Sequence, residues 1–589
     1  MCLKNLCLSI VLIFITGMFG FSQTNIRVSN PLAEEIMLGN YDPADYAASE
    51  VIDLPDAIIP DLVNRISTDS LLAYLQKLDS FYQRNTGSDT ISDTRGIGAT
   101  RRWIFNKFEA YSRANQNRLI VSYLDFDRLV CGMNKHKNVM AVLPGRDTTN
   151  KEILLVEGHF DTRCEGGCDT SCYTPGIDDN ASGTVLVMEL ARVMSRYSFN
   201  RTIVFTPVTG EDQGLHGAKA MAKYVAEKGI SVMACFNNDV VGGVTCGSRS
   251  SPPSCPGLNH VDSTNVRLFS YSTSNDSAKY SKHKQLARYI KLNQIERINP
   301  LLHTPMNINI IISEDRTGRS GDHIPFRQRG IAAIRFCSQN EHGSGGGNFP
   351  DRQHSTRDIL GIDTNSDGEI DSLFIDLNYL KRNAISNGVN LGLLANAPAA
   401  PEPEFEQTEN GVILHLLADD AEYNQHRVGV RSRGSGSLYF DTVLTFNNSI
   451  HLEINDLDRD KDYYFSVLNV ENESPGLFST EFLRENLLGL HYDSKRKGIN
   501  LGQNIPNPFN NNTLITIDNS SDKEYNNAEI LVMDQLGRSV KRIPTYLGLG
   551  ENEVMIENLD TMQGVLLYSL VIDGNFIQSK RMLMINKPE

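Results

Sequence analysis

The chain has 589 residues, 40% of them hydrophobic and 22% charged, a composition typical of folded protein rather than of a disordered chain. Its length exceeds what one compact core can hold and predicts several domains. The formal charge of -15 argues against a nucleic-acid partner, which would need clustered Lys and Arg.

The N-terminus has the layout of a signal peptide. A positive charge at Lys4 precedes an apolar run over 6–21, which is shorter than a membrane span needs. We therefore expect residues 1–23 to be removed and the mature protein to be exported without a transmembrane span. An uncleaved N-terminal anchor is the alternative.

Eight cysteines lie beyond this segment. Zinc-binding thiols usually come as pairs two residues apart, whereas Cys164, Cys168 and Cys172 are separated by three residues each. Because export favours disulfides, we predict disulfides here rather than a thiolate metal site. Cys246 and Cys255 are a further plausible pair.

The next segments predict an α/β domain over 65–396. Residues 24–64 form a polar lead-in without a strong period, and apolar residues at helical spacing then predict helices over 67–81 and 98–113. Apolar strands alternating with helices indicate a mixed, mostly parallel sheet with helices on both faces. The expected strands are 138–143, 152–157, 201–208, 232–236, 307–312 and 331–336, and the expected helices are 183–195, 216–228 and 278–292.

A Pro-rich linker at 397–403 marks a change to all-β sequence. Residues 463–470 alternate as a strand, and Leu457 stands six residues before Tyr463. This spacing resembles a fibronectin type III sandwich, which we place at 397–485.

The C-terminal segment, 499–589, predicts a second all-β sandwich. Its Asn-Ile-Pro-Asn-Pro-Phe string at 504–509 and its Gly537-Arg538 turn are similar to the sorting domain of type IX secretion. The resemblance implies that outer-membrane secretion machinery is a partner and that the protein is secreted or held at the cell surface. A carbohydrate-binding sandwich is the alternative, although no aromatic cluster for stacking on sugars is evident.

Five groups of acidic or His residues each follow a predicted strand in the α/β segment. The carboxyl edge of such a sheet is where ligands bind, so these groups are expected to converge on one cleft. The groups are His159 with Asp161, Asp178 with Asp179, Glu211 with Asp212, Asp239, and His354.

These residue types fit a hydrolytic zinc site. Imidazole nitrogen and carboxylate oxygen are the zinc ligands of such sites, and two zinc ions can share a bridging carboxylate and a bridging hydroxide. Glu211 and Asp212 are adjacent and need different roles: one can bind metal while the other accepts the proton of the attacking water.

Residues 65–395 resemble the co-catalytic zinc aminopeptidases, because they contain that family's motifs in the same order. The motifs are His-x-Asp, Asp-Asp-Asn-Ala-Ser-Gly, Glu-Asp-x-Gly-Leu-x-Gly, a single Asp, and His-Ser. That family, metallopeptidase family 28, also includes glutamate carboxypeptidases and glutaminyl cyclases. The resemblance implies two Zn²⁺ per chain and a cis peptide bond between Asp179 and Asn180. The roles it implies are a bridging Asp179, ligands His159 and Asp239 on one zinc and Asp212 and His354 on the other, Glu211 as general base, and Asp161 as the group that orients His159.

The segment 319–326 looks like the family's substrate-facing stretch, with Arg319, Asp322 and His323 as candidate substrate-binding residues. It departs from the family at Gly318, where some bacterial aminopeptidases have a Tyr. A further departure is Asp212, where Glu is common. These differences leave the substrate preference open.

A possible calcium loop follows His354. Five residues with oxygen-bearing side chains repeat at alternate positions around Gly368, as in the first half of a calcium loop, but Phe374 stands at the twelfth place. Structural calcium and a plain acidic turn both remain open. The candidate ligands are Asp363, Asn365, Asp367, Glu369 and Asp371.

The function expected is that of a secreted, zinc-dependent exopeptidase acting on peptides. Its most favoured form is an aminopeptidase in which a metal-bridging hydroxide attacks and Glu211 serves as general base. A glutamate carboxypeptidase or dipeptidase is the close alternative, because Arg316, Arg319 and Arg335 could bind a substrate carboxylate. A glutaminyl cyclase or a non-catalytic binding protein on the same fold is less favoured, since the ligand set is complete.

Overall fold

The structure is a computed structural model. It describes one residue of the predicted signal peptide, Gln23. Residues 1–22, residues 278–281 of a predicted helix, and Gly537 of the Gly537-Arg538 turn lie outside the described residues. The described residues are 23–271, 282–408, 411–433, 437–455, 457–458, 461–484, 498–534, 538–557, 559 and 564–585.

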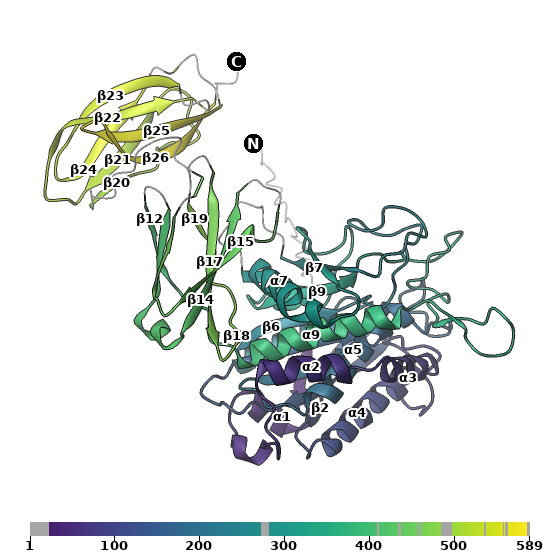
Figure 1. Cartoon of the computed structure of the whole chain (residues 1–589). Helices are drawn as coiled ribbons and strands as arrows, with labels where there is room; N and C mark the ends of the chain where they lie inside the picture. The colour runs from purple at the N-terminus through teal and green to yellow at the C-terminus, as the bar shows by residue number, and fades with distance from the viewer. Residues whose placement is uncertain are drawn as a thin grey trace, which may run out of the picture. The chain divides into compact units, whose positions relative to one another are not determined.

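The first compact unit contains residues 23–271, 282–398 and 472–476 and is built on one nine-stranded sheet (Figure 1). The strand order is β1-β2-β3-β5-β4-β6-β9-β7-β8. The four central strands β5, β4, β6 and β9 are parallel, so their carboxyl ends meet at one edge. The strands are β1 (Thr24–Val28), β2 (Ile120–Val130), β3 (Met133–Leu143), β4 (Ile153–His159), β5 (Thr202–Val208), β6 (Val232–Asn238), β7 (Asn265–Ser270), β8 (Asn307–Ile310) and β9 (Ala332–Ser338).

Helices cover both faces of this sheet. On one face α5 and α9 pack on β4 and β5, with α2 and α3 against them (Figure 1). On the other face α1, α6 and α8 share an apolar core with Met140, Leu155 and Val204 of the sheet. The helices are α1 (Pro31–Met37), α2 (Pro55–Arg65), α3 (Thr68–Asp79), α4 (Gly96–Ala114), α5 (Ser182–Met194), α6 (His216–Lys228), α7 (Lys282–Asn293), α8 (His323–Arg327) and α9 (Leu377–Asn396).

The predicted α/β arrangement of strands and helices is confirmed, with boundaries that move by a few residues. Helix α3, for example, begins after Ser67, whose hydroxyl accepts a hydrogen bond from the N–H of Ser70. A search of the described helices finds none with the length and apolar character that crossing a bilayer requires.

The lead-in at 24–64, in which the sequence shows no strong period, contains regular elements. Strand β1 adds to the edge of the sheet, and α1 buries Ala33, Ile36 and Met37 in the core. Helix α1 has only seven residues, too few to give a clear helical period, although Asn30 caps it and Pro31 begins it. A few apolar contacts with the larger domain stabilise elements that local sequence alone does not predict.

The second compact unit contains residues 399–471 and 477–585 and is all-β. Its N-terminal half is a sandwich, because the sheet β12-β13-β16 and a sheet containing β14, β15, β17 and β19 share a single apolar core. The strands are β12 (Glu404–Gln407), β13 (Val412–His415), β14 (Gln425–Ser432), β15 (Thr442–Asn447), β16 (His451–Ile454), β17 (Tyr463–Glu471) and β19 (Phe482–Arg484). The short strand β18 (Ser474–Pro475) follows β17 in sequence and belongs to the first unit.

The C-terminal half of this unit has two further sheets, β20-β21-β24 and β23-β22-β25-β26, around a core of their own. Two all-β sandwiches therefore follow the α/β sheet, as predicted. The strands are β20 (Ile499–Leu501), β21 (Thr513–Asn519), β22 (Tyr525–Met533), β23 (Ser539–Leu547), β24 (Gly550–Ile556), β25 (Gly564–Ile572) and β26 (Asn575–Met584).

The cysteines form disulfides, as predicted. The bonds are Cys131–Cys168, Cys164–Cys172 and Cys246–Cys255, and the last is the pair named as plausible from the sequence. Cys235 and Cys337 are free thiols buried in the α/β sheet.

Candidate metal centre and active site

The predicted ligands meet at the carboxyl edge of the four parallel strands. His159 is the last residue of β4, and Asp239 directly follows β6. Glu211 and Asp212 stand in the loop after β5, and Asp179 lies in the turn that leads into α5. His354 comes from the long loop after β9. Parallel strands thus bring together side chains that are almost 200 residues apart in the chain.

Asp179 lies between the two histidines. One carboxylate oxygen is 3.3 Å from Nε2 of His159, and the other is 3.1 Å from Nε2 of His354. His159 also lies 3.6 Å from Asp239, and His354 lies 3.2 Å from Asp212. The geometry is that of two adjacent sets of ligand atoms sharing one carboxylate.

The turn that carries Asp179 is held by backbone and amide hydrogen bonds. The Asp179–Asn180 peptide bond is cis, as the family resemblance implies. The Asn180 side chain donates to the carbonyl of Asn238 at 2.9 Å and accepts from the N–H of Gly183 at 3.0 Å. A Cβ at Gly183 would collide with the same Asn238 carbonyl, so this close approach of α5 to β6 requires glycine.

Asp161 contacts His159, and its carboxylate also accepts hydrogen bonds from the loop that carries Glu211 and Asp212. The ring Nδ1 of His159 lies 3.1 Å from the backbone carbonyl of Asp161 and 3.6 Å from its carboxylate. The two carboxylate oxygens accept hydrogen bonds from the N–H groups of Glu211 and Asp212 at 3.2 and 3.3 Å. Asp161 therefore orients the His159 ring mainly through its backbone and positions the Glu211-Asp212 pair through its side chain.

Arg163 is a site residue that the sequence analysis missed. Its Nε lies 3.0 Å from a carboxylate oxygen of Asp212, and its Nη2 lies 2.7 Å from Nδ1 of His354. The hydroxyl of Ser344 lies 2.9 Å from the same ring nitrogen. The signal available was its place two residues after Asp161 and directly before Cys164, where the loop closed by the Cys164–Cys172 disulfide begins.

The donor set fits zinc. Nε2 of His159, one oxygen of Asp212 and one oxygen of Asp239 are buried without a hydrogen-bond partner among the described residues. Buried polar atoms normally have a hydrogen-bond partner, so three unpaired ones at one place are consistent with ligands of a cation. The ligand atoms of His159, Asp179 and Asp239 all lie within 4.8 Å of one another, as do those of His159, Asp161 and Asp212. Imidazole and carboxylate are the usual ligands of hydrolytic zinc.

The electrostatics also favour a cation. Burial alone would lower the pKa of His354, but the neighbouring carboxylates Asp212 and Asp179 raise it to about 9. Burial would raise the pKa of Asp179, yet His159 and His354 hold it well below its usual value. The pKa of Glu211 is raised, first by burial and further by Asp239, despite the opposing charge of His159. The carboxylates around the two histidines thus stabilise positive charge at this place.

These residues line a pocket of about 360 Å³. Its walls carry charged or small polar side chains and glycine, namely Arg163, Asp179, Glu211, Asp212, Gly214, Asp239, Arg316, Gly318, Arg319, Ser320 and His354. Arg316 is paired with Glu341 at 2.7 Å. Arg319 donates to Ser344 and Gln353 at 2.9 and 3.2 Å and has no ion-pair partner among the described residues.

Three residues that the sequence offered for substrate binding, Asp322, His323 and Arg335, do not line this pocket. Asp322 and His323 are fully buried and do not line it, and Nε2 of His323 is hydrogen-bonded to the backbone carbonyl of Glu314 at 2.9 Å. Arg335 is also fully buried and is paired with Asp239 at 2.8 Å and with Asp315 at 3.0 Å. Of the candidates named in this stretch of the sequence, Arg316 and Arg319 face the pocket.

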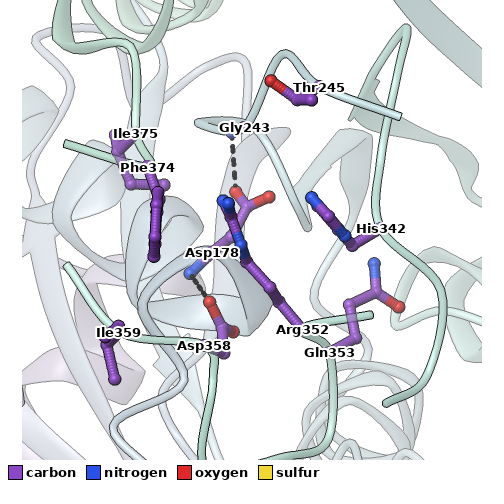
Figure 2. A pocket seen from close by; sticks show the side chains of 10 residues that line it. All are labelled: Asp178, Gly243, Thr245, His342, Arg352, Gln353, Asp358, Ile359, Phe374 and Ile375. Atoms are coloured by element: carbon purple, nitrogen blue, oxygen red, sulfur yellow. Dashed lines mark hydrogen bonds between the residues drawn. The ribbon is translucent and has the colours of Figure 1, made fainter. Parts of the chain in front are cut away.

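A second, much smaller pocket is lined by Asp178, the residue before Asp179 (Figure 2). Its volume of about 10 Å³ is room for one water molecule at most and too small for a substrate. Asp358 borders it and accepts hydrogen bonds from the N–H groups of Asp178 and Asp179, both at 2.9 Å. Asp358 therefore positions the backbone of the bridging carboxylate, a role not foreseen although it follows His354 by four residues.

The predicted calcium residues lie in the exposed hairpin between β10 (Gly361–Ile362) and β11 (Ser372–Leu373). Both carboxylate oxygens of Asp363 accept backbone N–H groups, from Ser366 at 2.6 Å and Gly368 at 2.8 Å. Those bonds lower the pKa of Asp363. The hairpin is thus stabilised by its own backbone, and calcium binding stays a prediction.

Comparison with known proteins agrees with this site. Residues 138–377 match the sequence model of peptidase family M28. A probable zinc metalloprotease of Leptosphaeria maculans is 31% identical over 367 residues, covering 59% of this chain and 78% of the relative. One of Pyrenophora tritici-repentis is 29% identical over 360 residues, covering 59% and 79%. Among solved structures, the aminopeptidase LapA of Legionella pneumophila is 20% identical, with a TM-score of 0.40 over 57% of this chain and 73% of that one.

The fold, the site and the relatives together define a zinc metallopeptidase. The chain belongs to peptidase family M28.

Proposed function

We propose that the protein is an exopeptidase with two zinc ions that removes N-terminal residues from peptides. His159, Asp179 and Asp239 would hold one ion, and His354, Asp179 and Asp212 the other. The observation that carries the proposal is the position of Asp179, whose two oxygens lie 3.3 and 3.1 Å from two different histidines. Glu211 lines the same pocket, where a peptide bond would lie.

The chain's own residues would perform the proton transfers. Zinc bound here supplies Lewis acidity toward the scissile carbonyl and the attacking water. Glu211 is placed to accept the proton of that water and to return it to the leaving amine. Its raised pKa suits this task, because a carboxylate with a higher pKa is the stronger base. Asp161 holds Glu211 in place through the backbone N–H bond.

A second candidate function is supported by Arg319. A half-buried guanidinium without an acidic partner among the described residues, in a pocket without apolar side chains, is suited to bind a carboxylate. That group could be the C-terminus of a dipeptide or the end of a carboxypeptidase substrate. The carboxypeptidase-like and dipeptidase activities are therefore the alternatives to aminopeptidase activity.

A small substrate panel separates these functions. An aminopeptidase is expected to cleave the nitroanilides of leucine, alanine or arginine and to lose activity when their amine is acetylated. Cleavage of an acyl-glutamate peptide with all three nitroanilides untouched would contradict the aminopeptidase assignment. In the same panel, Arg319→Gln should raise KM about 10- to 100-fold for Ala-Ala, and leave Ala-Ala-amide unaffected, if Arg319 binds the substrate carboxylate. Equal effects on the two substrates would exclude that role.

We also propose that the protein is exported, with residues 1–23 removed, and that the C-terminal sandwich directs it through the outer-membrane secretion machinery to the cell surface or medium. The support is the apolar run at 6–21 and the Asn-Ile-Pro-Asn-Pro-Phe string at 504–509. The first sandwich is proposed to be of fibronectin type III kind. Mass spectrometry of both ends of the secreted protein tests whether residues 1–23 are removed. Deletion of 499–589 tests the secretion role of the C-terminal sandwich, and that role is excluded if secretion is unchanged.

A further inference from the structure

Two histidines face each other on the solvent side of the three-stranded sheet β12-β13-β16. His415 of β13 is directly opposite His451 of β16 in the antiparallel register. Leu414 and Leu452, next to them in sequence, point into the core of the sandwich and are fully buried. Because side chains alternate along a strand, both histidines project from the outer face of the sheet.

The two rings are close and turned toward one another. Nδ1 of His415 lies 2.9 Å from Nδ1 of His451, and the rings are nearly perpendicular, with centroids 5.1 Å apart. Nε2 of His415 lies 3.0 Å from a carboxylate oxygen of Glu406, on the neighbouring strand β12. His415 is thus held between a second imidazole and a carboxylate.

These contacts fix which nitrogen of His415 carries the hydrogen. A carboxylate is an acceptor, so Nε2 of His415 must donate to Glu406. In the neutral ring this leaves the lone pair on Nδ1, directed at Nδ1 of His451. Nδ1 of His415 therefore accepts a hydrogen bond from Nδ1–H of His451. When that hydrogen is lost or moves to Nε2 of His451, two imidazole lone pairs lie side by side at the surface, and a metal ion can take the place of the hydrogen.

We propose that His415 and His451 form a binding site for a divalent transition metal, coordinated by their two Nδ1 atoms and completed by water. Imidazole nitrogen selects Zn²⁺, Ni²⁺ or Cu²⁺ over the oxygen-preferring Ca²⁺ and Mg²⁺. Glu406 has the place of the outer carboxylate that commonly accepts the second ring N–H of a metal-binding histidine and makes the ring a better ligand.

The site has two protein ligands. Among the described residues, the groups of three or more His, Cys, Asp and Glu with converging ligand atoms both contain His159, in the other compact unit. Water must therefore fill the remaining positions at His415 and His451, which makes the site weaker than a closed structural zinc site. Its exposure is consistent with this: the side chain of His415 is 30% and that of Glu406 55% exposed. The inference is independent of the proposed peptidase mechanism.

Titration of the zinc-loaded, full-length protein with NiCl₂ in a calorimeter tests the site. The wild-type protein is expected to show a binding event that His451→Gln and His415→Gln each abolish in the same concentration range. Glu406→Gln should weaken it about tenfold, since the imidazole loses its orienting carboxylate. A parallel titration with CuCl₂, followed by electron paramagnetic resonance, should show coupling of the copper to two nitrogens.

His303→Gln is the matched control, because His303 is exposed and has no second histidine against it among the described residues. It should bind Ni²⁺ as the wild type does, and peptidase activity and far-UV circular dichroism should be unchanged in all four variants. The proposal is overturned if wild-type protein binds no Ni²⁺, or if His451→Gln binds it with wild-type affinity and stoichiometry. Loss of peptidase activity in the wild-type sample would bear on the catalytic zinc and not on this site.

Discussion

Replacing Glu211 by Gln is expected to lower kcat by about 10²- to 10⁴-fold, the contribution typical of a positioned general base. Gln has nearly the same shape but cannot accept a proton at its amide. The Glu211 carboxylate lies 3.9 Å from Nε2 of His159, farther than the Asp179 and Asp239 carboxylates. Its loss should therefore remove proton transfer and leave metal bound.

The measurement combines steady-state kinetics with the ratio of zinc to protein after gel filtration. Glu165→Gln is the control, because Glu165 is an exposed carboxylate on the neighbouring disulfide-closed loop and does not line the pocket. It should keep wild-type kcat. If Glu211→Gln retains full activity with its metal in place, another group must be the base; if it loses zinc as well, the role of Glu211 includes binding the metal.

The arrangement of the site follows from the sequence because its residues occur at strand ends. His159 and Asp239 end or follow parallel strands, and strands of this kind present their carboxyl ends at one edge whatever their order in the sheet. Local patterns thus sufficed to predict that distant residues meet. They could not give distances, such as those that place Asp179 between the two histidines.

Partners chosen by tertiary packing could not be predicted in the same way. Arg319 and Arg335 are both arginines in one stretch of sequence, yet Arg335 lies inside the sheet against Asp239 while Arg319 faces the pocket. Arg163 and Asp358 occur in loops without periodicity, and their contacts depend on where the loops fold back. A linear pattern carries no information on which charges neutralise each other.

Helix α9 shows the same limit for the fold. It is the longest of the described helices, with twenty residues, and was not predicted. Nearly all of its length is buried, including Asn383, Asn387 and Asn390, so it lacks the polar stripe that marks a surface helix. Those amides bond other buried groups; Asn383, for example, donates to the carbonyl of Val241 at 3.0 Å. Only the surrounding protein makes these polar residues compatible with a central helix.

Replacing Asp179 by Asn is expected to release most of the zinc and to lower activity at least about 100-fold. Removing a residue that only hydrogen-bonds a metal ligand already lowers affinity or activity by up to about 100-fold, and Asp179 is itself a proposed ligand. The substitution keeps the size of the side chain but removes the negative charge and one of the two oxygens that face His159 and His354. Both proposed metal positions lose a ligand at once. The Asp358 bonds involve the backbone N–H of Asp179 and should survive, so the fold of the turn is expected to remain.

The neighbouring Asp178→Asn is the matched control. Asp178 lines the small pocket, where one of its oxygens accepts the N–H of Gly242 at 3.1 Å and of Gly243 at 2.9 Å. Figure 2 shows the bond to Gly243. Burial raises its pKa to about 6, against the lowering effect of those N–H groups, and an Asn oxygen can accept the same bonds. Zinc content and activity, measured against added zinc, should stay near wild type for Asp178→Asn and fall for Asp179→Asn. Equal loss in both variants would mean that the shape of the turn, and not the charge of Asp179, holds the metals.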